Sequence, residues 1–212
     1  KFTEQPPVGR LSGASGSGQW LNPILNVRQR MFLPQRRPGE DWIGVVIAVP
    51  EPWNSEITAL RQSLGDPMAL SVPPHITILP PIAVPLAEKE AVFEHLAQVA
   101  ERSRPFNLSL DGSGTFEPIS PVAFLNVAKG ALQCGQLADD VRVGALDYPS
   151  RFPYHPHVTL AQGVEPELLD LALKQTADFQ ADWMVQGFRV DRVEEDGSYV
   201  STAIFDFSSG AA

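Results

Sequence analysis

The sequence contains a single cysteine, Cys134, among its 212 residues. One thiol cannot form an internal disulfide, which argues against a disulfide-stabilised extracellular scaffold and favours a reducing compartment. No apolar run approaches the roughly 20 residues that a membrane-spanning helix needs. No hydrophobic signal-peptide core follows the first residues. These absences predict a cytoplasmic protein without membrane association.

Basic residues are also scarce, because 16 lysines and arginines stand against 25 acidic residues, for a net charge of −9. Six of those bases fall within the first 40 residues, so the remainder of the chain is more acidic still. Affinity for long nucleic acids depends mostly on neutralising their phosphates. This charge balance therefore argues against a clamp for long nucleic acids, whereas a small anion can still be held by a local cluster of donors.

Composition divides the chain into two parts. Residues 1–40 lack sustained periodicity and include the Gly/Ser-rich stretch 13–18, which is typical of a linker. We expect a disordered basic tail or an N-terminal extension there. Residues 41–212 are long enough to form one domain with a substantial core, or two small lobes that share one.

Two five-residue segments repeat one pattern. Residues 74–78 read Pro-His-Ile-Thr-Ile, and residues 156–160 read Pro-His-Val-Thr-Leu. Each contains His-x-Thr between apolar residues, as expected of a short strand with one buried face. Because side chains two positions apart in a strand share a face, His75 lies beside Thr77, and His157 beside Thr159.

Strands and helices are arranged similarly around both motifs. Strand, helix, motif strand and helix recur in the two halves, which predicts a duplicated α+β protein. We expect two pseudo-symmetric lobes with largely antiparallel sheets that face a central groove. Strands are expected near 42–49, 75–79, 106–110, 122–127, 157–160, 182–193 and 199–207, and helices near 54–64, 85–102, 131–142 and from 166 onward.

Two such His-Thr pairs across a cleft suffice to break a phosphodiester bond without a metal. One imidazole takes a proton from the attacking hydroxyl or water, and the other gives a proton to the departing oxygen. Histidine suits both tasks because its pKa lies near the working pH. The hydroxyls of Thr77 and Thr159 can donate to the phosphate oxygens where charge develops. His75 and His157 are therefore the candidate acid–base pair, with their two roles exchangeable.

At these residues the chain resembles the 2H phosphoesterase superfamily, in particular its LigT-like group of 2′-5′ RNA ligases and RNA 2′,3′-cyclic phosphodiesterases. The segment 114–125 also resembles the family segment between the two motifs. The resemblance implies a bilobal fold with helices outside and the motif residues in the groove. It implies opening of a 2′,3′-cyclic phosphate at an RNA end or on a small nucleotide, with reversible 2′-5′ ligation in some members. No cofactor is implied, and a monomer is expected.

Four further residues are candidates for substrate contacts. Arg151 and Tyr154 precede the second motif and could bind a phosphate oxygen. Phe116 and Phe124 could stack on a base. Each also has a structural interpretation, as a surface arginine, a packed tyrosine or core aromatics.

Three alternatives remain open at this point. His155 and His157 form a His-x-His that could hold a metal, although no further ligand cluster lies nearby in the sequence, so no metal site is predicted. The same groove could act on another small cyclic or 2′-5′-linked nucleotide. It could also bind an RNA terminus or a nucleotide without turnover.

Overall fold

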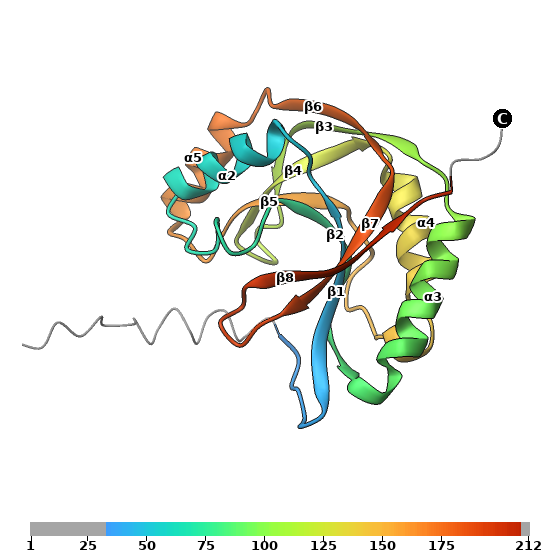
Figure 1. Cartoon of the computed structure of the whole chain (residues 1–212). Coiled ribbons are helices and arrows are strands. Elements are labelled where there is room, and N and C mark those ends of the chain that lie inside the picture. The colour runs from blue at the N-terminus through green and yellow to red at the C-terminus, as the bar shows by residue number, and fades with distance from the viewer. Residues whose placement is uncertain (1–32, 209–212) are drawn as a thin grey trace, which may run out of the picture.

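The computed structural model describes residues 33–208, so residues 1–32 of the predicted tail lie outside the described residues. Within the described part, eight antiparallel strands form one curled sheet with the order β6-β3-β4-β5-β2-β1-β7-β8, and four α-helices pack on its outside (Figure 1). The strands are β1 (Glu40–Ala48), β2 (His75–Pro85), β3 (Phe106–Thr115), β4 (Val122–Lys129), β5 (His157–Gln162), β6 (Gln180–Val185), β7 (Gly187–Val193) and β8 (Tyr199–Asp206). The α-helices are α2 (Trp53–Ser63), α3 (Lys89–Arg102), α4 (Ala131–Val141) and α5 (Pro166–Gln175), with the 3₁₀ turns η1 (Leu86–Glu88) and η2 (Gly144–Leu146).

The two motif strands lie at the centre of the sheet. β2 pairs with β5, and three further strands extend the sheet on either side. Helices α3 and α4 cover the lobe that contains β1, β2, β7 and β8, whereas α2 and α5 cover the other lobe (Figure 1). The predicted α+β fold with two pseudo-symmetric antiparallel lobes is thus confirmed. Its two sheets are joined through β2 and β5 into one.

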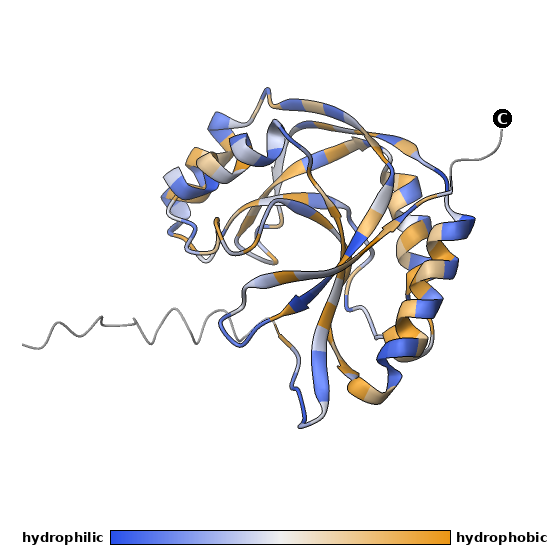
Figure 2. Cartoon of the chain, viewed as in Figure 1, coloured by the Kyte–Doolittle hydropathy of each residue, from blue (hydrophilic) through white to orange (hydrophobic). Residues whose placement is uncertain are grey.

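Alternation along the strands separates the face of the sheet that packs against the helices from the opposite, inner face, which we call the groove face. Ile76, Ile78, Val158 and Leu160 are at most 1% exposed and join the main hydrophobic cluster between sheet and helices. Figure 2 shows the same alternation of hydrophobic and hydrophilic residues along several strands. Because neighbouring residues in a strand face opposite ways, this burial turns the motif histidines and threonines to the inner face of the sheet.

The prediction of one long strand over residues 182–193 was wrong. The segment is divided at Gln186 into β6, which pairs with β3, and β7, which pairs with β1. The chain thereby passes from one lobe to the other. Directly after the break, a Cβ on Gly187 would lie only 2.2 Å from the carbonyl oxygen of Phe205, so the crossing requires a glycine.

The last residues of the predicted tail contact the folded body. The indole Nε1 of Trp42 donates to the carbonyl of Pro34 at 2.8 Å, and the guanidinium of Arg36 lies 4.5 Å from the Trp42 ring centroid. An indole supplies both an apolar face and one donor, and here both are used. The ordered body therefore begins several residues before residue 41.

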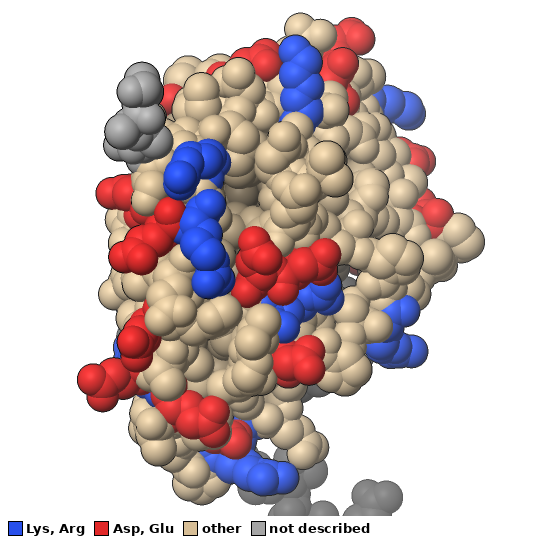
Figure 3. Space-filling view, turned by 90° about the vertical axis from the view of Figure 1, so that its right-hand side faces the viewer, with Lys and Arg blue, Asp and Glu red and all other residues tan. Residues whose placement is uncertain are grey.

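The outer surface over α3 and α4 carries charges of both signs. Figure 3 shows acidic and basic side chains intermingled there, without a continuous basic area. None of the helices in residues 33–208 is long and apolar enough to cross a membrane.

Candidate active site

The register between β2 and β5 brings the two motifs together. Ile76 lies opposite Val158, and both side chains point into the core. Consequently the flanking residues share the other face, with His75 across from Thr159 and Thr77 across from His157. Diagonal neighbours in an antiparallel pair have Cα atoms about 7–8 Å apart. The two histidines flank the Ile76–Val158 pair in that diagonal relation.

A backbone carbonyl orients each imidazole in the same way. Nδ1 of His75 lies 2.8 Å from the oxygen of Pro73, and Nδ1 of His157 lies 2.7 Å from the oxygen of His155. A carbonyl oxygen can only accept, so Nδ1 must carry the proton in both rings. The neutral tautomer therefore leaves Nε2 unprotonated in both cases.

The proline that precedes each histidine explains why the sequence folds this way. Pro74 and Pro156 fix their own φ and restrict the preceding residue to extended conformations. The carbonyl that accepts from Nδ1 belongs to that preceding residue. The Pro-His-x-Thr pattern thus fixes both the strand face and the tautomer.

Both imidazoles are disfavoured in their charged form. Burial lowers the pKa of His75 from its ordinary 6.5 to about 4, against the opposing effect of the hydrogen bond to Pro73. Burial also lowers the pKa of His157, again against its hydrogen bond to a carbonyl. Both side chains nevertheless remain half-buried rather than sealed. An anion bound between them would favour the protonated form.

The threonine hydroxyls are available for a ligand. Thr77 and Thr159 are half-buried, and neither hydroxyl has a protein partner among the hydrogen bonds of residues 33–208. Both share a face with the histidines, so they can donate to the same phosphate.

Phe116 and Phe124, the two candidates for base stacking, pack beside the second motif. Phe124 lies opposite Thr159 on β4, and its ring centroid is 5.2 Å from that of His157. The ring of Phe116 is 4.9 Å from that of His157 and 4.2 Å from that of Phe124. Phe124 is 4% exposed and is covered by its neighbours on the motif face, whereas Phe116 is half-buried and open to a ligand. Base stacking itself stays a prediction.

The structure adds one tyrosine and two charged residues that sequence reasoning missed, all near the first motif. Tyr199 on β8 packs against His75, with ring centroids 5.4 Å apart. On β7, Arg189 donates through Nε and Nη2 to the fully buried carboxylate of Asp191, at 2.6 and 2.8 Å. Arg189 and Asp191 alternate in sequence, but only the pairing of β7 with β1 shows that they share the groove face.

Tyr154 and Arg151, which were predicted to contact a phosphate, lie in different surroundings from those expected. The hydroxyl of Tyr154 donates to the carbonyl of Thr77 at 2.9 Å, so it cannot donate to a phosphate while that bond holds. The bond instead ties the loop before His157 to the first motif strand. Arg151 is exposed in the same loop, and none of the hydrogen bonds or ion pairs within residues 33–208 joins it to a motif residue.

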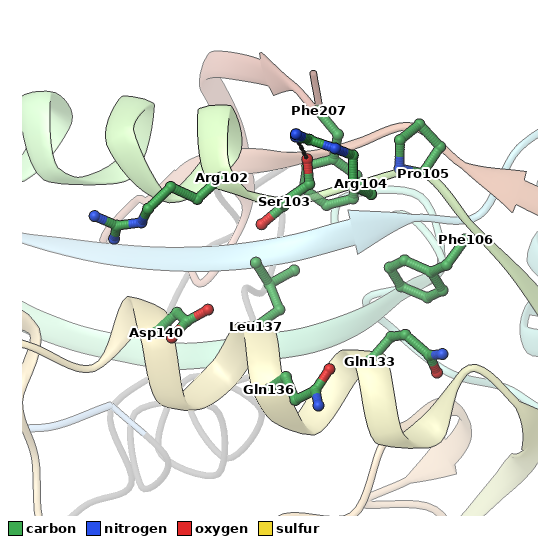
Figure 4. A pocket seen from close by; sticks show the side chains of 10 residues that line it. All are labelled: Arg102, Ser103, Arg104, Pro105, Phe106, Gln133, Gln136, Leu137, Asp140 and Phe207. Carbon is green, nitrogen blue, oxygen red and sulfur yellow. Dashed lines mark hydrogen bonds between the residues drawn. The ribbon is translucent and has the colours of Figure 1, made fainter. Parts of the chain in front are cut away.

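Other candidate sites do not coincide with the motifs. A cavity of about 340 Å³ between the C-terminal end of α3 and one side of α4 is lined by residues such as Arg102, Arg104 and Asp140 (Figure 4), and no motif residue borders it. In the described part of the chain, no group of three His, Cys, Asp or Glu side chains is arranged to hold a metal ion. Cys134 is buried, and burial raises its thiol pKa to about 12.

Known proteins are similar to this chain in sequence. A provisionally named phosphoesterase of Bacillus cytotoxicus is 29% identical over 120 residues, which cover 57% of this chain and 69% of that protein. A second, from Bacillus cereus strain B4264, is 25% identical over 170 residues, which cover 79% of this chain and 98% of that protein. The names of these relatives describe enzymes that act on phosphoesters.

Solved structures show the same arrangement of strands and helices. Escherichia coli LigT, complexed with 3′-AMP, aligns with a TM-score of 0.57 at 18% identity, over 80% of this chain and 99% of that one. TT0787 of Thermus thermophilus aligns with a TM-score of 0.55 at 22% identity, over 80% of this chain and 100% of that one.

The description of the matching family model is "2′-5′ RNA ligase superfamily", and the match spans residues 48–196. That segment includes both motif strands and all four described α-helices. The chain therefore belongs to the 2′-5′ RNA ligase superfamily.

Proposed function

We propose that this chain is a metal-independent cyclic phosphodiesterase that opens a 2′,3′-cyclic phosphate at an RNA end or on a small nucleotide. When a 5′-hydroxyl replaces water as the nucleophile, the same displacement joins two RNA ends through a 2′-5′ phosphodiester, and this ligation is reversible. The observation that carries the proposal is the shared face of β2 and β5, on which two equally oriented imidazoles and two free hydroxyls adjoin.

The chemistry follows from the tautomer and the charge of each ring. Burial keeps His75 neutral at pH 7, with Nε2 free to accept a proton, so we assign His75 as the general base. It removes a proton from water while the water oxygen forms its bond to phosphorus. His157, protonated next to the phosphate anion, gives its Nε2 proton to the departing 3′-oxygen as the P–O3′ bond breaks. The product is then a 2′-phosphate.

The threonines stabilise the charge that develops. Thr77 and Thr159 lie across from the opposite histidines, so their hydroxyls can donate to the two non-bridging oxygens. Phe116 offers a ring face for the base of the nucleotide. The 3′-AMP held by Escherichia coli LigT, which shares the fold, fits this class of ligand.

The test is a turnover assay on the four nucleoside 2′,3′-cyclic phosphates and on an RNA with that terminus, with and without excess EDTA. We expect turnover that EDTA does not reduce, and a 2′-phosphate product. Binding of these nucleotides without turnover would contradict the proposal and favour a binding module. Loss of activity in EDTA, restored by a divalent metal, would contradict the metal-independent mechanism.

Three histidine variants separate the proposed pair from its neighbour. His75→Ala and His157→Ala should each lower kcat by about 10²–10⁴-fold, the usual contribution of a positioned acid or base. His155→Ala is the matched control, since it keeps the carbonyl that orients His157, and it should stay within a few-fold of the parent. Full turnover by either variant of the pair would rule out the mechanism.

A further inference from the structure

Arg189 stands in line with the first motif across the sheet. It lies opposite Val46 on β1, and Val46 in turn lies opposite Thr77 on β2. Residues directly opposite one another in antiparallel strands share a face, so Arg189 and Thr77 both face the groove. Strands are about 4.7–4.9 Å apart, which places Arg189 two strands, or about 10 Å, from Thr77 along the sheet.

An ion pair holds the guanidinium of Arg189 in place and occupies only some of its hydrogen-bond donors. Asp191, with 0% of its side chain exposed, accepts from Nε and Nη2, while 18% of the Arg189 side chain remains exposed. An arginine has five N–H donors in a planar fork. Within residues 33–208, Asp191 is its sole hydrogen-bond acceptor, so three donors remain for a ligand on the exposed edge. Such a fork matches the geometry of a phosphate.

A second arginine on the same strand provides the contrast. Arg192 also pairs with a carboxylate two residues later, since its Nε and Nη2 donate to Glu194 at 3.1 and 2.5 Å. It is an odd number of positions from Arg189 and therefore lies on the other face of β7. Its partner is also half-exposed, unlike the buried Asp191. Only Arg189 combines a buried anchor with a position on the motif face.

We propose that Arg189, anchored by Asp191, forms a second phosphate subsite in the groove, for ribonucleotides that carry phosphates at two positions of one ribose. One phosphate lies between His75 and His157, and the second reaches the free edge of the Arg189 guanidinium. The inference rests on the proposed function for the position of the first phosphate. It goes beyond that function because it assigns the recognition of a second phosphate to the first lobe.

The arrangement of the Arg189–Asp191 ion pair bears on this assignment. Burial is the main cause of the lowered pKa of His75; both members of the pair also act on it, with Asp191 raising the pKa and Arg189 lowering it to a smaller extent, so both lie near the motif. The ion pair with Asp191 is neutral overall, but it is oriented with its carboxylate buried and its guanidinium toward the groove. A fixed donor edge of this kind loses little conformational entropy when an anion binds.

The experiment compares the binding of two product-type probes, which require no turnover. Dissociation constants are measured by calorimetry for adenosine 2′-monophosphate and adenosine 2′,5′-bisphosphate, with adenosine 3′,5′-bisphosphate as a positional variant. The parent protein should bind at least one bisphosphate ten-fold or more tightly than the monophosphate. Arg189→Lys, which keeps the charge and loses the fork, should reduce that preference several-fold.

A double variant removes the ion pair without leaving a buried unpaired charge. Arg189→Met with Asp191→Leu should abolish the preference for the bisphosphate, whereas Arg192→Met should retain it in full. Thermal melting of each variant is recorded to show that the protein remains folded. If the double variant does not fold, the Lys variant alone carries the test.

The possible results separate the subsite from the proposed reaction. A preference that is absent in the parent, or that persists without Arg189, overturns the subsite, and so does equal weakening of both probes. Turnover of cyclic nucleotides together with such a result leaves the proposed function standing. Conversely, an Arg189-dependent preference without any turnover supports the subsite and overturns the function.

Discussion

His75 has charged side chains and one tyrosine ring near it, whereas His157 lies among phenylalanine rings. Arg61, Asp191 and Arg189, members of the ion pairs Arg61–Asp66 and Arg189–Asp191, all influence the pKa of His75. In the second lobe the neighbours of the motif histidine are phenylalanine rings. The two histidines nevertheless share the same position on a strand, the same tautomer and a preceding proline.

This contrast separates what the reaction needs from what the substrate needs. In-line displacement requires an acid and a base on opposite sides of one phosphorus, and duplicated strands supply that pair. A nucleotide is not symmetric, since it has a flat base at one end and charged groups elsewhere. Aromatic rings on one side and charged side chains on the other therefore favour one orientation of the bound nucleotide. Its base lies toward Phe116 and its further phosphates lie toward Arg189.

The largest expected effect concerns the stability of the fold. Arg61 and Asp66 form a buried ion pair, with side chains 5% and 3% exposed, and Arg61 also donates to the carbonyl of Val72. Arg61→Met leaves the Asp66 carboxylate buried without its partner and should cost about 3–5 kcal/mol in the free energy of unfolding. Urea denaturation measures this loss.

The matched control for that prediction lies on a helix of the other pair. Arg142 pairs with Asp139 at the surface, with side chains 24% and 74% exposed, so Arg142→Met should cost less than about 1 kcal/mol. Equal losses in the two variants would contradict the difference between a buried and an exposed pair.

The loss of kcat on removing a motif hydroxyl should be the same in both lobes. Thr77→Val and Thr159→Val each remove one hydroxyl without changing the shape of the side chain, and each should lower kcat by about 10²–10³-fold. The control is Thr202→Val, whose hydroxyl bonds the Val190 carbonyl from β8. A loss confined to one motif threonine would show that only one lobe stabilises the developing charge.

Base recognition should depend on the second lobe alone. Phe116→Ala should raise KM for cyclic nucleotides about ten-fold, because stacking of one base contributes about 1–3 kcal/mol. It should leave the KM for ribose 2,3-cyclic phosphate, which has no base, nearly unchanged. Phe152→Ala, in the exposed loop before the second motif, serves as the control. Equal effects on both substrates would contradict a stacking role.

The pH profile tests the different roles of the two histidines. The base must be neutral, so kcat/KM should rise as pH increases through the His75 pKa of about 4. The acid must be protonated, so kcat/KM should fall above the His157 pKa, which burial lowers below 6.5. The maximum of kcat/KM should therefore lie on the acidic side of pH 6.5. A maximum well above neutrality would contradict the assigned protonation states.

Local sequence patterns predicted the motif faces and most elements, because both depend on near neighbours. Alternation of apolar residues placed His75 and Thr77 on one face, and helical spacing located α3 and α4 within a few residues. The fold class followed from the repeated order of elements.

Long-range pairing lay beyond those patterns. The strand break at Gln186, which carries the chain between lobes, depends on the contact of Gly187 with Phe205. The approach of Tyr199 and Arg189 to the first motif likewise depends on how β7 and β8 extend the sheet. Tyr154 was expected at the phosphate because it precedes the motif, but its hydroxyl is bound by a carbonyl from the other half of the chain.

The most direct test of the account is a crystal structure with a nucleoside 2′-monophosphate bound. Nε2 of His75 and Nε2 of His157 should each lie within about 2.6–3.2 Å of oxygens on the same phosphate. A phosphate that contacts only one of these nitrogens, or that binds outside the face shared by β2 and β5, would contradict the paired-histidine mechanism.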